Sequence, residues 1–393
     1  MPDTSVKRIH ESMRGAPVFN GVAGSTITLL DTFLVNGWGL ATAQSLSVSG
    51  GVATINMPVG SEFEDHCAVL VAGATPASLN GEQRIATTNG TTLTFPTTAP
   101  DGPATGTITV KYAPCGWEKA FSGTNVAVYR SQDISTSRRY LRVDDSSATE
   151  TRVVGYNTMT DVNTGTGPFP TSAQIAGGGY WPKVVSAGTT AQRYDLIGDS
   201  AIFYIALAHF YKSNGSTDDV SGSYAKPFGA LVPLATGGDP WCTVLGVVAA
   251  SAGYNNPTGT VIGGPYGGLY AERSLDGASP AQSTAAGGEG QDINNISGAD
   301  NYALGVFPNA VDGRLRLGRS LLRMTASDRT PRAVMPGVYT VPHTNSVLSY
   351  KPFTARCTIP GTGPLAGRKL MLLWFGGASR SGAAFYDITG PWR

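Results

Sequence analysis

The spacing of apolar residues changes early in the chain from the period of a helix to the period of strands. In the segment "GSTITLLDTFLVNGWG", apolar side chains recur at helical spacing at Ile27, Leu30 and Leu34. Ser25 or Thr26 is a suitable N-cap, and Asn36–Gly37 is typical of a helix end. The pattern predicts one short amphipathic helix.

After this helix, apolar and polar residues alternate in short runs that are separated by turn residues. Gly50–Gly51, Asn80–Gly81 and Asn89–Gly90 each indicate a tight turn. Around them lie six strand patterns, "SLSVS", "VATINM", "CAVLVAG", "EQRIA", "TLTF" and "GTITVKY". The sequence therefore predicts a compact six-stranded β module over residues 44–113.

Apolar runs bounded by Gly, Asp and Pro continue through the rest of the chain. They include "NVAVYR", "YLRVDD", "SAIFYIALAHF", "WCTVLGVVAA" and "KLMLLWF". Such runs are typical of strands covered on both faces, as in a β-sandwich or barrel. The expected fold is mainly β, with a sandwich- or barrel-like body, the inserted module, one short N-terminal helix and long Gly-rich loops.

The pattern divides the chain into an arm, a body and an insertion. Residues 1–20 are expected to form an N-terminal arm that lies across a neighbouring subunit in an assembly. Residues 21–43 and 114–393 are assigned to one main β body, with room for two subdomains, and residues 44–113 to the insertion. The segment 251–300 is rich in Gly, Ser and Asn and is expected to form surface loops ordered by neighbours.

The charge balance excludes a strongly charged surface. The 393-residue chain has 28 Lys and Arg against 27 Asp and Glu, a formal net charge of +1, and 14% of its residues are charged. This balance gives no global field to hold nucleic acid. The surface must be polar mainly through neutral groups, which lose less than charges do on leaving water. Such a surface suits a subunit of a symmetric homo-oligomer.

The cysteines indicate neither a disulfide framework nor a metal site. They are far apart, form no CxxC pair and are expected to act as small buried hydrophobes; they are Cys67, Cys115, Cys242 and Cys357. No apolar run reaches the length of a membrane span, and the polar N-terminus lacks a secretion signal. We expect the chain to fold in the cytoplasm of the cell that makes it.

Groups that could carry out catalysis are sparse. The sequence lacks the phosphate-loop, HExxH and GxSxG motifs. The acid pairs Asp144–Asp145 and Asp218–Asp219 are candidates because glycan-cleaving enzymes use two carboxylates. Acids in turns are commonly caps or Asx turns, and the second pair is also a candidate cation site. We predict no catalytic, cofactor-binding or metal residue, and a protein that is not an enzyme.

The basic segment 312–332 is the strongest local charge feature. The planar guanidinium of arginine binds a carboxylate through two hydrogen bonds, which suits subunit contacts. The candidate interface residues are Arg314, Arg316, Arg319 and Arg323. The first two are predicted on one face of a strand, with Leu315 and Leu317 on the other. Contact with packaged DNA and a solvated face with local salt bridges are the alternatives.

Tyrosines in and after the Gly-rich segment form a second candidate site. Tyr254, Tyr266 and Tyr270 are a candidate ligand loop, because aromatic rings can stack on sugars. This hypothesis applies if the protein contacts a host cell-surface glycan.

The stretch "VLVAGATPASLNGEQRIATTNGTTLTFP", followed by "DGPATGTITV", resembles a small β module found in structural proteins of tailed bacteriophages and prophages. In that module a Gly-His-Gly-Phe-like segment usually precedes the third strand, and here it reads "GSEFEDHC". The segments "GAPVFNG", "FSGTNVAVYRS", "MTDVNTGTGPFP", "GGGYWPK" and "DITGPWR" resemble parts of a phage virion protein of undefined role. The resemblance implies virion structure and no defined activity.

Composition and resemblance together predict a structural subunit of a tailed-phage virion, made in the cytoplasm of the bacterial host. A tail component, such as a tail-tip, baseplate or head–tail connecting protein, is the first interpretation, with other virion proteins as partners. The alternatives are a host-surface-binding or capsid-decorating virion protein, and a glycan depolymerase.

Overall fold

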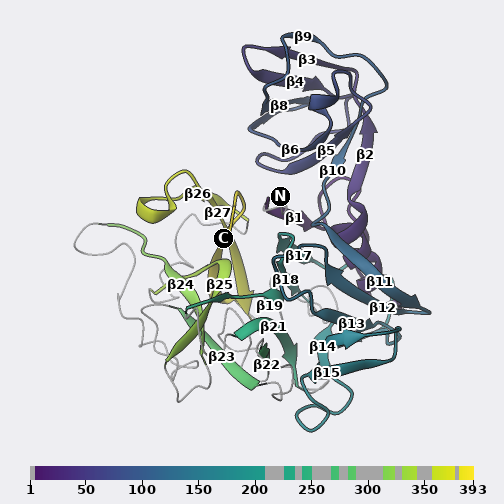
Figure 1. Cartoon of the computed structure of the whole chain (residues 1–393), viewed down its shortest axis with the longest axis vertical. Coiled ribbons are helices and arrows are strands. Elements are labelled where there is room, and N and C mark those ends of the chain that lie inside the picture. The colour runs from purple at the N-terminus through teal and green to yellow at the C-terminus, as the bar shows by residue number, and fades with distance from the viewer. Residues whose placement is uncertain are drawn as a thin grey trace.

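The computed structural model of the chain describes residues 5–208, 225–234, 241–249, 267–273, 282–288, 313–323, 330–342, 356–376 and 380–393. Figure 1 shows a large β body from which a smaller β module projects. The prediction of a mainly β chain with a sandwich- or barrel-like body and one short helix is confirmed.

The module consists of two antiparallel sheets. The four-stranded sheet has the order β2 (Trp38–Thr42), β10 (Thr109–Tyr112), β5 (Ala68–Ala72) and β6 (Gly81–Arg84). The five-stranded sheet has the order β7 (Thr87–Asn89), β8 (Thr92–Pro96), β4 (Val52–Asn56), β3 (Ser45–Ser49) and β9 (Gly102–Pro103). A short 3-10 turn, η2 (Ala77–Leu79), precedes β6.

The module has more strands than its sequence pattern predicts. Eight strands, β3 to β10, lie between residues 45 and 112, where six were predicted. The run "EQRIATTNG" divides because β6 pairs with β5 whereas β7 pairs with β8 in the other sheet. The strand β2, which the sequence pattern assigned to the body, pairs with β10.

The body is built from antiparallel pairs that join 19 described strands into one curled sheet. Its first part contains β1 (Lys7–His10), β11 (Trp117–Gly123), β12 (Val126–Ser131), β13 (Tyr140–Asp144), β14 (Glu150–Met159), β15 (Gly165–Phe169), β16 (Gly179–Pro182), β17 (Tyr194–Gly198), β18 (Ile202–Leu207), β19 (Ala225–Ala230), β21 (Trp241–Val248), β22 (Gly267–Arg273) and β23 (Gln282–Gly288). Its second part contains β20 (Val232–Pro233), β24 (Gly318–Arg323), β25 (Pro331–Thr340), β26 (Thr358–Pro360), η4 (Gly363–Leu365), β27 (Lys369–Gly376) and β28 (Arg380–Asp387).

Three expectations about the body are corrected. Residues 7–10 of the expected N-terminal arm form β1, which pairs with β17. The expected loop segment 251–300 contains β22 and β23, and its other residues lie outside the described ones. The long strand β25 was not predicted, because prolines at both its start and its middle obscure the pattern.

The predicted helix is present but begins differently from its pattern. α1 spans Ser25–Leu30 and continues as the π-helical segment η1 over Asp31–Asn36. Gly24, with φ of 86°, is the N-cap residue, and no side chain of its own caps the helix. The expectation that a hydroxyl residue of the segment would be the N-cap is therefore wrong. Gly37 ends the helix, as the sequence predicted.

An aromatic column joins this helix to the module. The rings of Phe33 on η1 and Trp38 on β2 have centroids 6.3 Å apart. Trp38 stacks on Tyr112 of β10 with a centroid distance of 4.8 Å, and Tyr112 lies 4.7 Å from Phe63. The guanidinium of Arg14 lies 4.8 Å over the Phe63 ring. One hydrophobic cluster thus runs from the body into the module.

Replacement of Trp38 by alanine should destabilise this joint strongly, because it removes a buried ring that packs between Phe33 of the helix and Tyr112 of the module. We expect Trp38→Ala to lower the free energy of unfolding by about 3–5 kcal/mol in a urea titration. Trp38→Phe is the matched control, since it keeps a ring and removes an indole N–H that has no hydrogen-bond partner in the described structure. Equal losses for the two variants would contradict this assignment.

Candidate interaction site

A buried carboxylate holds the start of α1 in place. Oδ2 of Asp145, which follows β13, accepts hydrogen bonds from the backbone N–H of Thr26 at 2.8 Å and of Ile27 at 3.4 Å. Oδ1 accepts from Nζ of Lys183 at 2.7 Å and from the hydroxyl of Thr151 at 2.9 Å. Asp145 therefore supplies, from a position remote in sequence, the cap that the helix lacks.

The partner lysine is equally buried. Nζ of Lys183 also donates to the carbonyl oxygens of Val22 at 2.7 Å and Ser147 at 3.1 Å, so all three ammonium hydrogens are used. Burial lowers the pKa of Lys183, and the hydrogen bond and charge of Asp145 oppose that fall. The pair connects the start of the helix, the end of β13 and the segment after β16.

The two acids of the pair at 144–145 have separate roles. Asp144 is partly exposed and accepts hydrogen bonds from Arg142 at 3.5 Å and from the backbone N–H of Ser146 at 3.3 Å. Asp145 is fully buried in its helix cap. These two carboxylates thus do not face a common open site, and Asp218–Asp219 lie outside the described residues.

Polar contacts, most of them between charged side chains, fasten the module to the body. We name this group the ionic clamp; it comprises Lys7, Arg8, His10, Glu64, Glu82 and Arg84. From β1, Nζ of Lys7 lies 2.9 Å from the carboxylate of Glu82 on β6. The carboxylate of Glu64 lies 2.9 Å from Arg8 and 2.8 Å from His10. Three successive contacts thus tie β1 to the base of the module.

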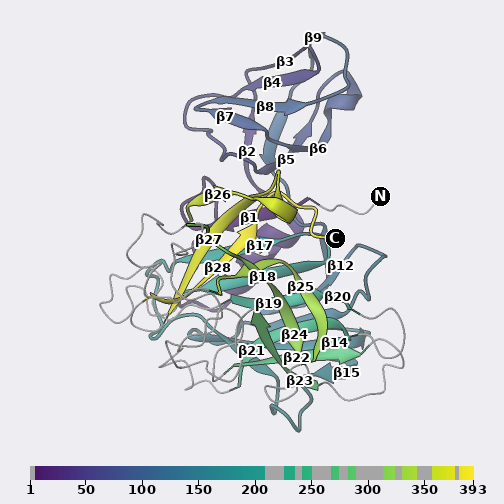
Figure 2. The same ribbon diagram turned by 90° about the vertical axis from the view of Figure 1, so that its left-hand side faces the viewer.

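Arg84 completes the clamp from the module side. Its guanidinium donates to the carbonyl oxygens of His66 at 2.9 Å, Ile388 at 3.2 Å and Val6 at 3.2 Å. β6 is thereby connected to the residue before β1 and to the residue after β28. Figures 1 and 2 both show β1 and the C-terminus near the base of the module.

The far end of the module has the opposite character. None of the residues in the five strands that the structure describes in its distal sheet is charged. Alternate residues such as Leu46, Ile55 and Phe95 are buried. Most residues on the other side carry hydroxyl or amide groups, although at one end of the sheet this side also presents Val52, which is 43% exposed, and Pro96 opposite it. The hydroxyl and amide residues are named here the hydroxyl face: Ser45, Ser47, Thr54, Asn56, Thr87, Asn89, Thr92 and Thr94.

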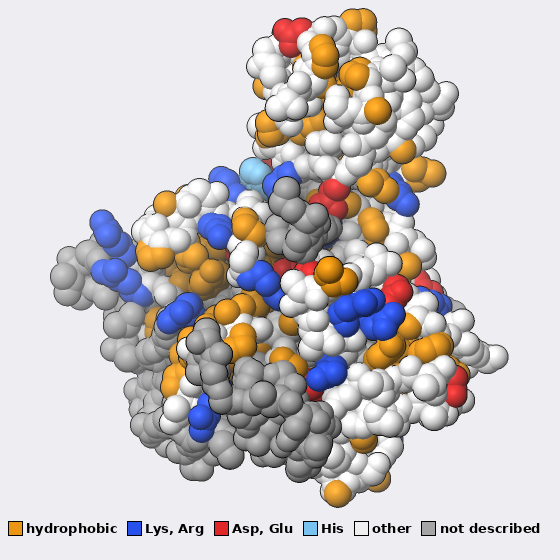
Figure 3. All heavy atoms as spheres, in the orientation of Figure 1, with side chains coloured by type: hydrophobic (Ala, Val, Ile, Leu, Met, Phe, Trp, Pro, Cys, Tyr) orange, Lys and Arg blue, Asp and Glu red, His pale blue; other side chains and the backbone are white. Residues whose placement is uncertain are grey.

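Strand register aligns the hydroxyl face into two rows. One row is Ser47, Thr54, Thr94 and Thr87, and the other is Ser45, Asn56, Thr92 and Asn89. Neighbours within the rows bind one another, with 2.7 Å between the hydroxyls of Thr87 and Thr94 and 2.9 Å from Asn56 to Ser45. Figure 3 shows few acidic or basic side chains on the visible side of the module, compared with the body.

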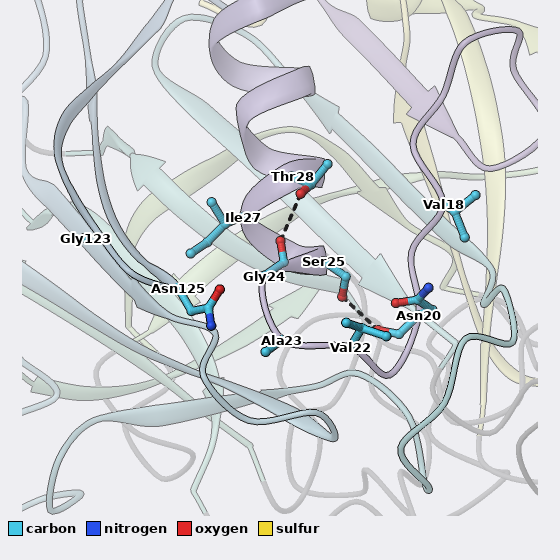
Figure 4. Close-up of a pocket in the computed structure, with 10 residues that line it drawn as sticks. All are labelled: Val18, Asn20, Val22, Ala23, Gly24, Ser25, Ile27, Thr28, Gly123 and Asn125. Carbon is cyan, nitrogen blue, oxygen red and sulfur yellow. Dashed lines mark hydrogen bonds between the residues drawn. The ribbon is translucent and has the colours of Figure 1, made fainter.

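A neutral pocket lies beside the start of α1 (Figure 4). It has a volume of about 480 Å³ and is lined by Val18, Asn20, Val22, Ala23, Gly24, Ser25, Ile27, Thr28, Gly123 and Asn125. Val18 and Val22 are 62% and 43% exposed at its rim. The lining carries no charged side chain, so the pocket is a second neutral surface, on the body.

The four candidate arginines lie on or just before β24. Arg314 and Arg316 are exposed and alternate with Leu315 and Leu317, which pack against a small hydrophobic cluster. The alternation is as predicted, but the strand begins only at Gly318. On β24, Arg319 is exposed and Arg323 is half-buried. Their participation in a subunit interface stays a prediction.

The tyrosine hypothesis needs a correction at one residue. Tyr270 lies on β22, is 8% exposed and belongs to the main hydrophobic cluster, so its ring is not open to a sugar. The sequence analysis assigned Tyr270 to a loop because the surrounding residues are rich in glycine, and it therefore did not predict the strand. Tyr254 and Tyr266 lie outside the described residues.

All four cysteines are free thiols. Burial raises the pKa of both Cys67 and Cys242 to about 12, so neither thiol is ionised at neutral pH. Cys242 donates to Glu272 at 2.5 Å, and Glu272 also pairs with Arg139. Across the described parts of the chain, no group of three His, Cys, Asp or Glu side chains could hold a metal ion.

Besides Lys7 of the ionic clamp, two further buried lysines, Lys183 and Lys226, were missed by the sequence analysis. Lys183 belongs to the hydrogen-bond network around Asp145 that is described above. Burial lowers the pKa of Lys226 on β19 to about 7. Each is a lone charge next to apolar or aromatic residues, in "GGGYWPKVV" and "YAKPFGA". That local contrast is the signal that could have identified them.

In the portion that the structure describes, no helix has the length and apolar character to cross a membrane.

Comparison with models of known protein families and with curated proteins gives no match to this chain.

Removal of both members of the buried pair should cost less than the sum of the two single removals. We expect Asp145→Asn and Lys183→Met each to lower the free energy of unfolding by about 3–5 kcal/mol, because each leaves a buried group uncompensated. The double variant should lose less than the sum, by about 0.5–3 kcal/mol. Denaturant titration of the four proteins measures this coupling, and strict additivity would show that the pair acts as two independent groups.

Acid should weaken the contacts that Glu64 makes in the ionic clamp. Burial raises the pKa of Glu64, but the hydrogen bond from His10 and the charge of Arg8 outweigh it and hold the pKa below its ordinary value of 4.5. The carboxylate therefore stabilises the fold above that ordinary value, and the contribution is lost as pH falls through the folded-state pKa. The melting temperatures of the unmodified chain and of Glu64→Gln should differ most at neutral pH and converge in acid. A difference independent of pH would contradict this role.

Proposed function

We propose that the chain is a structural subunit of a tailed-phage virion and that the hydroxyl face of its module contacts neighbouring subunits. The observation that carries the proposal is the contrast between the two ends of the module. Its base is fastened to the body by the ionic clamp, whereas the strands of its distal sheet carry no charge. A module held in one orientation with a neutral outer face is suited to packing against another protein.

The physical basis is the cost of removing the face from water. Neutral hydroxyl and amide groups lose less than charges do when they are desolvated, and they can exchange hydrogen bonds with a partner. The sheet edges favour contact through the face, since β7 has 3 residues and β9 has 2 residues that include Pro103. Short or proline-containing edge strands disfavour uncontrolled strand pairing.

A tail component, such as a tail-tip, baseplate or head–tail connecting protein, is the position that we propose within the particle. The sequence resemblance supports virion structure, and the projecting module supports a role in contact. The same projection would serve a capsid-decorating or host-surface-binding protein, which is the second candidate. For the depolymerase alternative, the acids at 144–145 provide no shared carboxylate site, because they have separate structural roles, and the other acid pair lies outside the described residues.

The proposal predicts that a charge on the hydroxyl face blocks assembly without unfolding the chain. Thr94→Arg places a cation in the middle of the face, and Thr158→Arg on β14 is the matched control. Both threonines bond to a threonine across the strand, at 2.7 Å and 2.6 Å. In particles purified from cells that carry the gene, Thr94→Arg should be depleted and Thr158→Arg retained, as quantified by mass spectrometry.

Thermal unfolding of both purified variants is the control for folding. Absence of the unmodified chain from the particles would overturn the virion assignment. Normal incorporation of a folded Thr94→Arg protein would instead overturn the role of the hydroxyl face and leave the virion assignment standing.

A further inference from the structure

Asn–Gly pairs are chemically labile where the chain leaves them free to react. The sequence contains five such pairs: Asn20–Gly21, Asn36–Gly37, Asn80–Gly81, Asn89–Gly90 and Asn214–Gly215. The last lies outside the described residues. Glycine has no Cβ to block the approach of its own backbone nitrogen to the preceding side-chain carbonyl. The reaction then depends on whether hydrogen bonds or packing hold the asparagine side chain and the N–H of the following glycine in place.

Two of the described pairs are held by hydrogen bonds. Oδ1 of Asn80 accepts from the backbone N–H of Ala74 at 2.8 Å, and its Nδ2 donates to the carbonyl of Ala74 at 2.7 Å. The N–H of Gly37, which would have to attack Asn36, donates to the carbonyl of Thr32 at 2.9 Å at the end of η1.

A third pair is held by packing. Gly21 is buried and forms a bridge with Gly188, and a Cβ at Gly21 would lie 2.6 Å from the side chain of Val184. Rearrangement of the Asn20–Gly21 backbone would therefore disturb its neighbours.

Asn89–Gly90 combines exposure of both residues with the absence of the hydrogen bonds or close packing that hold the other three pairs. Both residues are exposed, in the tight turn between β7 and β8. Gly90 has φ of 58°, and a Cβ placed on it would meet nothing within 4 Å. Among the described residues, no hydrogen bond is made by the side chain of Asn89 or by the N–H of Gly90 in the turn.

We propose that Asn89 is a site of spontaneous deamidation in the folded protein. The backbone nitrogen of Gly90 attacks Cγ of Asn89, the new C–N bond closes a five-membered succinimide, and the side-chain nitrogen leaves as ammonia. One water molecule then opens the ring at either carbonyl, giving aspartate or isoaspartate. The reaction needs no oxidant, reductant or enzyme.

The product changes the surface on which Asn89 lies. Asn89 is opposite Thr92 in the second row of the hydroxyl face, whose strands otherwise carry no charge. Deamidation places a carboxylate there, and isoaspartate also adds a methylene to the backbone of the turn. The inference goes beyond the proposed function, because the reaction at Asn89 requires only the local geometry.

Peptide mapping by mass spectrometry tests the site directly. The folded full-length chain is incubated at mildly alkaline pH, and conversion is followed at Asn20, Asn36, Asn80 and Asn89. We expect only Asn89 of these four to convert in the folded chain, and all four to convert at similar rates in urea. Asn89→Gln should abolish conversion at that position, since its longer side chain closes the ring far less readily.

Persistence of the Asn89 amide in the folded chain, or conversion of Asn36 or Asn80 as fast as Asn89, would overturn the proposal. A second measurement compares Asn89→Asp with Asn89→Gln in purified particles. Depletion of the Asp variant alone is expected if the hydroxyl face is a contact surface. Equal incorporation would count against that surface and leave the chemical assignment of Asn89 to be decided by peptide mapping.

Discussion

The buried carboxylate of Asp145 is the constraint on which the rest of the arrangement depends. It caps the first turn of α1 and neutralises Lys183 within the body. The helix that it fixes continues through Phe33 to Gly37, where the chain leaves for the module. A displaced helix start would therefore move the aromatic column at the base of the module. The buried ion pair therefore contributes, with the contacts at the base of the module, to the placement of this projecting part of the molecule.

Two kinds of interaction, aromatic packing and the ionic clamp, hold the module against the body. The stacked rings of Trp38 and Tyr112 exclude water and supply burial, but stacking by itself tolerates rotation. The ionic clamp adds directional contacts from β1 and from the segment before the C-terminus, with Glu64 and Arg84 as its centres. Because these contacts come from segments far apart in the chain, the orientation of the module depends on the complete body.

The distribution of charge along the module is the basis of the proposed contact role. Most charged groups of the module lie at its base, where they have partners, and Asp101 lies beside Gly50 at a turn of the distal sheet. The strands of that sheet carry no charge and present mainly neutral hydroxyls and amides. A nearly neutral chain could have mixed its few charges evenly over the surface. Their separation leaves one face that is cheap to desolvate, and it also makes that face sensitive to any single new charge, such as one formed at Asn89.

The sequence by itself determined the β class, most apolar strands and the hairpin turns, because these follow from neighbouring residues and their spacing. It did not predict β22 or β25, where glycine or proline obscures the local pattern. It offered Asp145 either as one of a pair of catalytic carboxylates or as a cap or turn residue, without locating a helix for it to cap, and it offered Tyr270 as a ligand-binding residue. Only the tertiary structure decided these roles, because the helix that Asp145 caps lies 119 residues away and the core that encloses Tyr270 is formed by strands remote in sequence. The hydroxyl face lies between these cases: alternation predicts its residues, but strand register in the folded sheet brings them into rows.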